Sequence, residues 1–194
     1  MQISAENVAD ADDVEPIAIF DDVLPAPIIT ALADEVQRQG FQYGWYANKD
    51  KGFPHWNRNY GQTGRDRLNR DEILSELCLP VRAAWDCLSK TYAQGATVIR
   101  AYANAYTFGT EGYLHTDSTV PSDVTFLLYL NREWRRDWAG ETLFFDGHDV
   151  MATVLPKFNR MVVFPSIVPH VARSVSRSCS VARTIFTFKA KTDD

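Results

Sequence analysis

The chain has 194 residues, of which 45% are hydrophobic, and a formal net charge of −5. This length favours a single domain with a substantial core. The acidic balance argues against a nucleic-acid partner, and no apolar run approaches the roughly 20 residues that cross a membrane. The three cysteines form no CxxC pair and the acidic N-terminus contains no secretory signal, so a cytoplasmic location is expected.

The first half of the chain predicts helices. Apolar residues recur every four positions between Pro27 and Gly40, which is typical of an amphipathic helix. The aromatic- and glycine-rich stretch 41–64 is interpreted as a long loop with short strand pieces, a kind of loop that often covers active sites. The elements predicted here are a flexible acidic tail over 1–15, a strand over 16–20, and helices over 26–40, 69–79 and 80–95.

From Thr97 onward the residue pattern favours short strands rather than helices. The predicted strands cover 97–107, 113–117, 123–131, 141–146, 150–155, 160–164, 168–175 and 181–189. Helices followed by about eight short strands predict an α+β fold, in which a double-stranded β-helix (jelly roll) over 97–190 is supported by helices over 26–95. Residues 16–194 would then form one domain.

Three residues of the strand-rich half have the chemistry of a metal site. His115 and Asp117 are two apart, so on an extended strand they would point to the same face. His170 would supply the third ligand. Two imidazoles and one carboxylate suit non-haem Fe(II), with coordination positions left open. Of the other histidines, His148 is expected to face solvent, and His55 suits a substrate contact or a structural role equally well.

A second feature is Arg183, which lies on an alternating strand with its side chain directed inward. A buried arginine needs a carboxylate, and no acidic residue of the local sequence is an obvious partner. A bidentate bond to a bound diacid would satisfy it. Exposure at the rim is the alternative, and Arg173 or Arg177 could compete for the same diacid.

These motifs resemble those of the Fe(II)/2-oxoglutarate-dependent oxygenases, in the prolyl 4-hydroxylase-like branch. The similarity extends beyond His115, Asp117, His170 and Arg183. It includes the segments YTFG before the first histidine, FLLYLN with the following tryptophan and AGET, PKFNRMVVFP before the distal histidine, and IFDDVLPAPIITAL near the start. It covers residues 16–190, least clearly over 41–96.

The resemblance implies roles for individual residues. His115, Asp117 and His170 would bind Fe(II), and Arg183 would hold the distal carboxylate of 2-oxoglutarate. The hydroxyl of Tyr129 would assist Arg183. Tyr106 would lie beside the end of 2-oxoglutarate that chelates the metal.

The resemblance also implies a reaction. With O₂ as the second cosubstrate, 2-oxoglutarate is converted to succinate and CO₂ while an unactivated C–H bond is oxidised. Halogenating relatives replace the carboxylate ligand by a small residue, so Asp117 favours hydroxylation, or desaturation, ring closure or C–N cleavage. The compact domain favours a polar small-molecule metabolite or natural product as substrate. The candidate substrate-binding residues are Trp56, Asn57, Arg58, Tyr102 and Asn104.

Three alternatives stay open at this point. The first is a prolyl or other protein-residue hydroxylase. The second is a cupin-like metal protein that does not use 2-oxoglutarate, for which replacing Arg183 would have no effect. The third is a non-catalytic binding module, which would tolerate Asp117→Ala. The sequence leaves the oligomeric state open.

Overall fold

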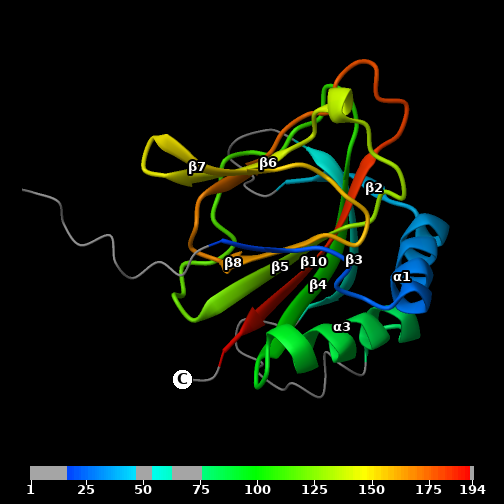
Figure 1. Ribbon diagram of the computed structural model, residues 1–194, viewed down its shortest axis with the longest axis vertical. Helices are drawn as coiled ribbons and strands as arrows, with labels where there is room; N and C mark the ends of the chain where they lie inside the picture. Colours follow the sequence, from blue (N-terminus) through cyan, green and yellow to red (C-terminus); the bar gives the residue numbers. More distant parts are fainter. Residues whose placement is uncertain (1–16, 47–53, 63–75, 193–194) are drawn as a thin grey trace, which may run out of the picture.

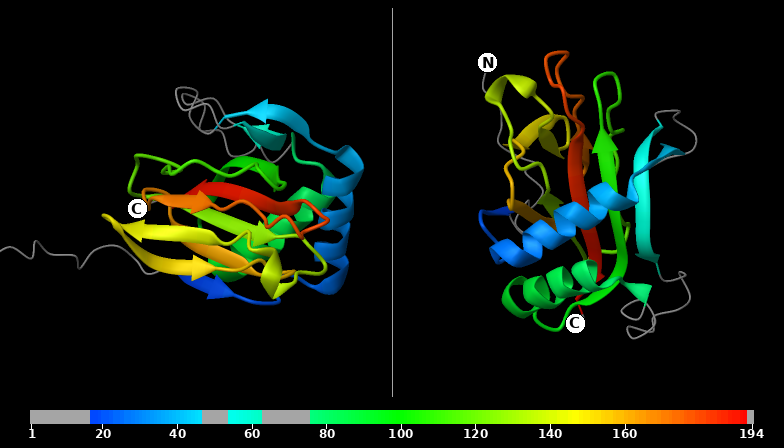
Figure 2. Two further views of the ribbon diagram at one scale, coloured as in Figure 1. Left: turned by 90° about the horizontal axis from the view of Figure 1, so that it is seen from above. Right: turned by 90° about the vertical axis from the view of Figure 1, so that its right-hand side faces the viewer.

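A computed structural model describes residues 17–46, 54–62 and 76–192. Two sheets face each other, and two helices cover the outer side of the larger one (Figures 1 and 2). The predicted tail over 1–15 and most of the helix predicted over 69–79 lie outside the described residues. No described helix has both the length and the apolar character needed to cross a bilayer.

The larger sheet has seven strands in the order β1-β8-β5-β10-β4-β3-β2, and the smaller sheet has three in the order β7-β6-β9. All of the pairings are antiparallel. This two-sheet arrangement confirms the predicted jelly roll. The strands are β1 (Ala18–Phe20), β2 (Gln42–Trp45), β3 (His55–Gln62), β4 (Thr97–Tyr106), β5 (Asp123–Tyr129), β6 (Thr142–Asp146), β7 (Asp149–Val154), β8 (Met161–Pro165), β9 (His170–Ala172) and β10 (Arg183–Lys191).

The two long helices are α1 (Ala26–Gln39) and α3 (Leu79–Tyr92), close to their predicted ranges. A proline stands in the first turn of each, where the missing N–H costs nothing. A short 3-10 helix, η2 (Arg136–Trp138), precedes β6. The core between the helices and the larger sheet contains Trp85 of α3, which packs against Phe126 and Phe188.

The alternation of side chains divides the larger sheet into two faces. Phe186 and Phe188 of β10 belong to the core beneath the helices, whereas Ile185 belongs to the core between the sheets. The face that looks toward the smaller sheet is called the inner face below. Arg183 and Lys189 have the parity of Ile185, so they lie on the inner face.

Two predictions about local structure were wrong. Residues 113–117 form no strand, and His115 makes only an isolated bridge with His170. The second concerns 41–64, where His55–Gln62 is an eight-residue strand paired with β4. The aromatic and polar residues of this strand obscured its alternation, because polar side chains such as Asn57 are buried there.

Candidate active site

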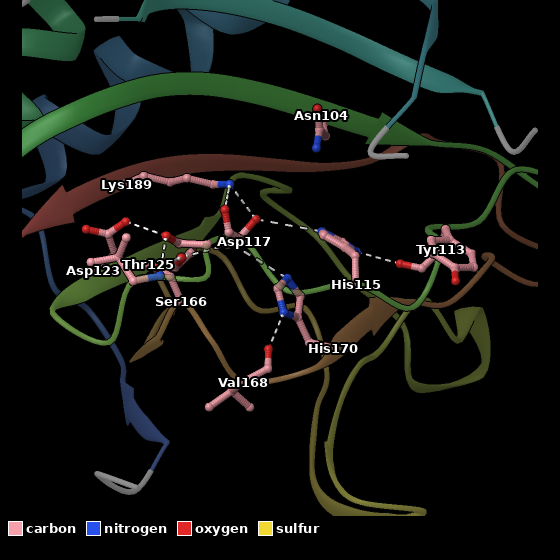
Figure 3. Close-up of polar contacts among 12 residues, drawn as sticks. Asn104, Tyr113, His115, Asp117, Asp123, Thr125, Ser166, Val168, His170 and Lys189 are labelled. Atoms are coloured by element: carbon pink, nitrogen blue, oxygen red, sulfur yellow. Dashed lines mark hydrogen bonds and ion pairs between the residues drawn. The ribbon is translucent and has the colours of Figure 1, made fainter. Parts of the chain in front are cut away.

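Three side chains converge at the open end of the jelly roll. The ligand atoms of His115, Asp117 and His170 all lie within 4.8 Å of one another. Asp117 Oδ1 is 3.7 Å from His115 Nε2, and Asp117 Oδ2 is 3.7 Å from His170 Nε2 (Figure 3). The structure therefore brings the three predicted residues together, from a loop and β9 rather than from two strands.

Backbone contacts orient both imidazoles toward the carboxylate. His115 Nδ1 lies beside the carbonyl oxygen of Tyr113, and His170 Nδ1 is 3.0 Å from that of Val168 (Figure 3). A carbonyl oxygen only accepts, so each Nδ1 must carry the proton. The lone pair is then on Nε2, which faces Asp117. Second partners of this kind fix the tautomer of metal-binding histidines.

The electrostatics also suit a metal. Burial lowers the pKa of His170 to about 4, so its imidazole is neutral and free to coordinate near neutral pH. Burial alone would raise the pKa of Asp117, but the neighbouring His170 and His115 and the charge of Lys189 hold it well below its usual value. The site therefore presents two imidazole nitrogens and one carboxylate, a donor set suited to Fe(II).

A further set of polar residues holds Asp117 in place. The hydroxyl of Thr125 donates to Asp117 Oδ2 at 2.8 Å and contacts the hydroxyl of Ser166 at 2.8 Å. The backbone N–H of Asp117 donates to the carbonyl oxygen of Ser166. Lys189 Nζ lies 2.8 Å from Asp117 Oδ1 (Figure 3). Neither Thr125 nor Lys189 was predicted as a site residue, although the inward parity of both strands was visible in the sequence.

Arg183 lies on the same inner face and is fully buried. Its Nε donates to the carbonyl oxygen of Gly140 at 2.6 Å, and its Nη2 to the hydroxyl of Thr142 at 2.7 Å. Its Nη1 is buried without a hydrogen-bond partner among the described residues. Arg173, by contrast, pairs with Glu111 and is half exposed. Arg183 is therefore buried with a donor that no described residue accepts, whereas Arg173 has an acidic partner.

Two tyrosines flank the Arg183 guanidinium. Its carbon is 5.2 Å from the ring centroid of Tyr129 and 5.4 Å from that of Tyr106. The Tyr129 hydroxyl contacts that of Thr142 at 2.7 Å and lies 3.2 Å from the carbonyl oxygen of Val154. Both tyrosines are therefore adjacent to Arg183. The sequence analysis expected this position for Tyr129, whereas it placed Tyr106 beside the metal-chelating end of 2-oxoglutarate.

The candidate substrate residues separate into two groups. Asn57, Asn104 and Tyr102 are buried on the inner face, where Asn57 Nδ2 donates to Asn104 Oδ1 at 2.7 Å. Figure 3 shows Asn104 on β4, facing the space above the metal ligands. Trp56 and Arg58 lie on the opposite face of β3, where Arg58 donates to Gln39 of α1. A substrate role for these two residues is incompatible with that placement, because β3 itself separates them from the metal ligands.

The two remaining histidines can also be placed. His148 is exposed in the β6–β7 turn, as expected. His55 is 2% exposed and stacks on Tyr106 with 5.1 Å between ring centroids. The structure therefore shows a packing contact of His55 with Tyr106.

Comparison with known proteins agrees with this site. The model of the 2OG-Fe(II) oxygenase superfamily matches residues 101–188, a range that contains the three converging residues and Arg183. The part of the chain that carries the site therefore matches this superfamily. This match and the cluster of His115, Asp117 and His170 indicate a dioxygenase dependent on Fe(II), 2-oxoglutarate and O₂. No curated protein sequence matches the chain.

Solved structures show the same fold. A prolyl-4-hydroxylase from Pseudomonas putida is 21% identical with a TM-score of 0.62, covering 91% of this chain and 92% of that one. A prolyl hydroxylase from Trichoplax adhaerens, in complex with a hypoxia-inducible-factor peptide fragment, is 19% identical with a TM-score of 0.59, covering 90% and 83%. HygX from Streptomyces hygroscopicus, with iron bound, is 11% identical with a TM-score of 0.57, covering 91% and 82%. The fold of this oxygenase is thus that of the prolyl hydroxylase-like branch.

Proposed function

We propose that this oxygenase hydroxylates an unactivated C–H bond of a polar small-molecule metabolite or natural product. Desaturation, ring closure and C–N cleavage follow from the same site chemistry. The observation that carries the proposal is the buried Nη1 of Arg183, which has no described partner and shares the inner face with the residues that would bind iron. A guanidinium of this kind meets a carboxylate in a charge-assisted hydrogen bond.

In this proposal His115, Asp117 and His170 bind Fe(II). The bound metal, with 2-oxoglutarate and O₂, supplies the oxidising power that breaks a C–H bond, and the cosubstrate leaves as succinate and CO₂. The chain's own contribution is to orient the reactants and exclude water. Arg183 holds the distal carboxylate of 2-oxoglutarate through Nη1, while Gly140 and Thr142 fix the orientation of its guanidinium.

Tyr106 is assigned to the chelating end of 2-oxoglutarate. Burial raises the pKa of Tyr106 to about 12, so its hydroxyl stays protonated. That oxygen accepts a hydrogen bond from Asn104 Nδ2 at 3.4 Å, and Asn104 accepts one from Asn57. This chain of amides leaves the phenolic proton free to donate to the cosubstrate. Asn57, Asn104 and Tyr102 are then the polar wall nearest the substrate.

Anaerobic titration tests the proposed cosubstrate site. Metal-free protein is loaded with Fe(II) and titrated with 2-oxoglutarate, and the visible charge-transfer band of the chelate is recorded. Arg183→Gln is expected to require at least about 100-fold more 2-oxoglutarate, since it removes a charged partner. Arg173→Gln is the matched control and is expected to titrate like the wild type. Equal titration of all three proteins would refute the assignment of Arg183.

A prolyl or protein-residue hydroxylase is the second candidate. Its support is the similarity of fold to the prolyl hydroxylases from Pseudomonas putida and Trichoplax adhaerens. Succinate release, measured in parallel with a metabolite panel and with proline-containing peptides, separates the two candidates. Release with peptides alone would overturn the small-molecule proposal.

A further inference from the structure

Arg100 on β4 has two buried donors that no described residue accepts. Its Nε and Nη2 both lack a hydrogen-bond partner among the described residues. Its guanidinium carbon lies 4.5 Å from the ring centroid of Tyr102 and 4.9 Å from that of Trp45. Such cation–π contacts involve the faces of a guanidinium and leave its N–H edge unsatisfied. Nε and Nη2 form the edge that meets a carboxylate through two parallel hydrogen bonds.

The charges around Arg100 favour an anion. Arg100 is the register partner of Lys189 on β10, and like charges directly opposite each other destabilise a sheet. Lys189 is compensated by Asp117. Across the described residues, no carboxylate lies within ion-pair distance of Arg100. A bound anion would supply both the missing charge and the missing acceptors.

The position of Arg100 relative to the metal ligands suits a substrate group. Arg183 pairs with Tyr106 at one end of the β4–β10 ladder, and Arg100 pairs with Lys189 six positions away. These two ends are about 20 Å apart along the strands. Lys189 Nζ contacts Asp117, so the side chain paired with Arg100 reaches the candidate metal ligands. Arg100 is therefore separate from the guanidinium assigned to 2-oxoglutarate, yet its register partner contacts the candidate metal site.

Trp45 lies between this position and solvent. It belongs to β2 at the edge of the larger sheet, and it is 40% exposed. Its ring and that of Tyr102 form two walls around the guanidinium. Because Nε and Nη2 are themselves buried, a ligand would reach the edge of Arg100 by displacing the indole ring, where the organic part of a small acid would find aromatic surface.

We propose that Arg100 binds a carboxylate group of the organic substrate, side-on, between the rings of Trp45 and Tyr102. The substrate class is thus a small carboxylic acid whose oxidised carbon lies between this anchor and the metal. The inference rests on the proposed function, because only an oxygenase would use the bound acid as a substrate. Binding of the anion itself does not require turnover.

The test is a titration of the Arg100 Nε–H resonance by NMR. The ¹⁵N-labelled protein is loaded with Zn(II) and saturating 2-oxoglutarate, so that the metal and cosubstrate sites are filled. The Arg100 signal is assigned by its loss in Arg100→Lys. Acetate and benzoate are expected to shift it saturably, whereas the neutral acetamide and benzamide leave it in place. Trp45→Ala is expected to weaken benzoate binding about tenfold, because it removes one wall.

The control is Arg58→Lys, which changes an arginine on the opposite face of β3 and should leave the benzoate titration unchanged. The proposal is overturned if neither carboxylate gives a saturable shift or if benzamide acts like benzoate. Tighter binding of inorganic phosphate than of benzoate would also overturn it, because the ligand would then be tetrahedral. Failure of the proposed function would show instead in the 2-oxoglutarate titration of Arg183→Gln, which does not involve Arg100.

Discussion

Lys189 Nζ lies 2.8 Å from Asp117 Oδ1 and 2.8 Å from the backbone carbonyl oxygen of the same residue. The side chains are 13% and 4% exposed, so this is a buried ion pair. Removing one partner of such a pair leaves an uncompensated charge. The lysine therefore stabilises the carboxylate when no metal is present, and a bound metal ion would take over part of that role.

Lys189→Met is expected to destabilise the metal-free protein by about 3 kcal/mol. Zn(II) should restore more stability to this variant than to the wild type, since the ion supplies the missing positive charge. Thermal unfolding with and without Zn(II) measures both effects. Lys90→Met, at an exposed position of α3, is the control. Equal losses with and without metal would contradict this account of Lys189.

Thr125→Val is expected to weaken metal binding by about 10- to 100-fold, the usual cost of losing an outer hydrogen bond to a ligand. The variant keeps the side-chain shape but removes the donor to Asp117 Oδ2. Competition with a chromogenic chelator gives the Zn(II) affinity. Thr153→Val changes an exposed threonine of β7 and should bind Zn(II) as the wild type does. An unchanged affinity in Thr125→Val would mean that Ser166 alone suffices to orient Asp117.

Gly140→Ala is expected to disturb the Arg183 site. The backbone of Gly140 has φ +77°, and an added Cβ would lie 2.9 Å from Trp134 Cζ2 and 3.2 Å from Arg183 Cδ. The clash should cost about 2 kcal/mol of stability and raise the dissociation constant of 2-oxoglutarate. Gly147→Ala is the matched control, since its φ is +56° with nothing within 4 Å of the added atom. If both variants bind 2-oxoglutarate equally well, the close packing at Gly140 does not position Arg183.

Asp21 provides a prediction about pH. Hydrogen bonds from Arg160 and Lys157 lower the pKa of Asp21 to about 2, from 3.8. A carboxyl group with a lowered folded-state pKa contributes stability above 3.8 and loses it as the pH falls toward 2. Asp21→Asn should therefore lower stability by less than about 1 kcal/mol at pH 7, because the pairs are partly exposed.

Urea denaturation of both proteins at pH 7, 5 and 3 tests this. The difference between wild type and Asp21→Asn is expected to be the same at pH 7 and 5 and smaller at pH 3. High salt should also reduce it. A difference that grows on acidification would have the wrong sign for this ion pair.

Much of the fold and part of the site followed from local patterns in the sequence. Period-four apolar residues determined α1, and alternation determined which side of β10 carries Arg183 and which carries Phe186. His115, Asp117 and His170 could be recognised as candidate metal ligands because few residue types have side chains that bind metals. These features depend on residue type and on spacing within one element, so the sequence alone contains them.

Other features depend on contacts between distant segments. Only the pairing of β3 with β4 decided that Asn57 faces the inner side while Trp56 and Arg58 face the helices. Only the register of β10 against β4 placed Arg100 opposite Lys189. Sequence determined which side chains share a strand face, but the tertiary structure decided what each face meets, because strand partners and register are set by packing across the whole sheet.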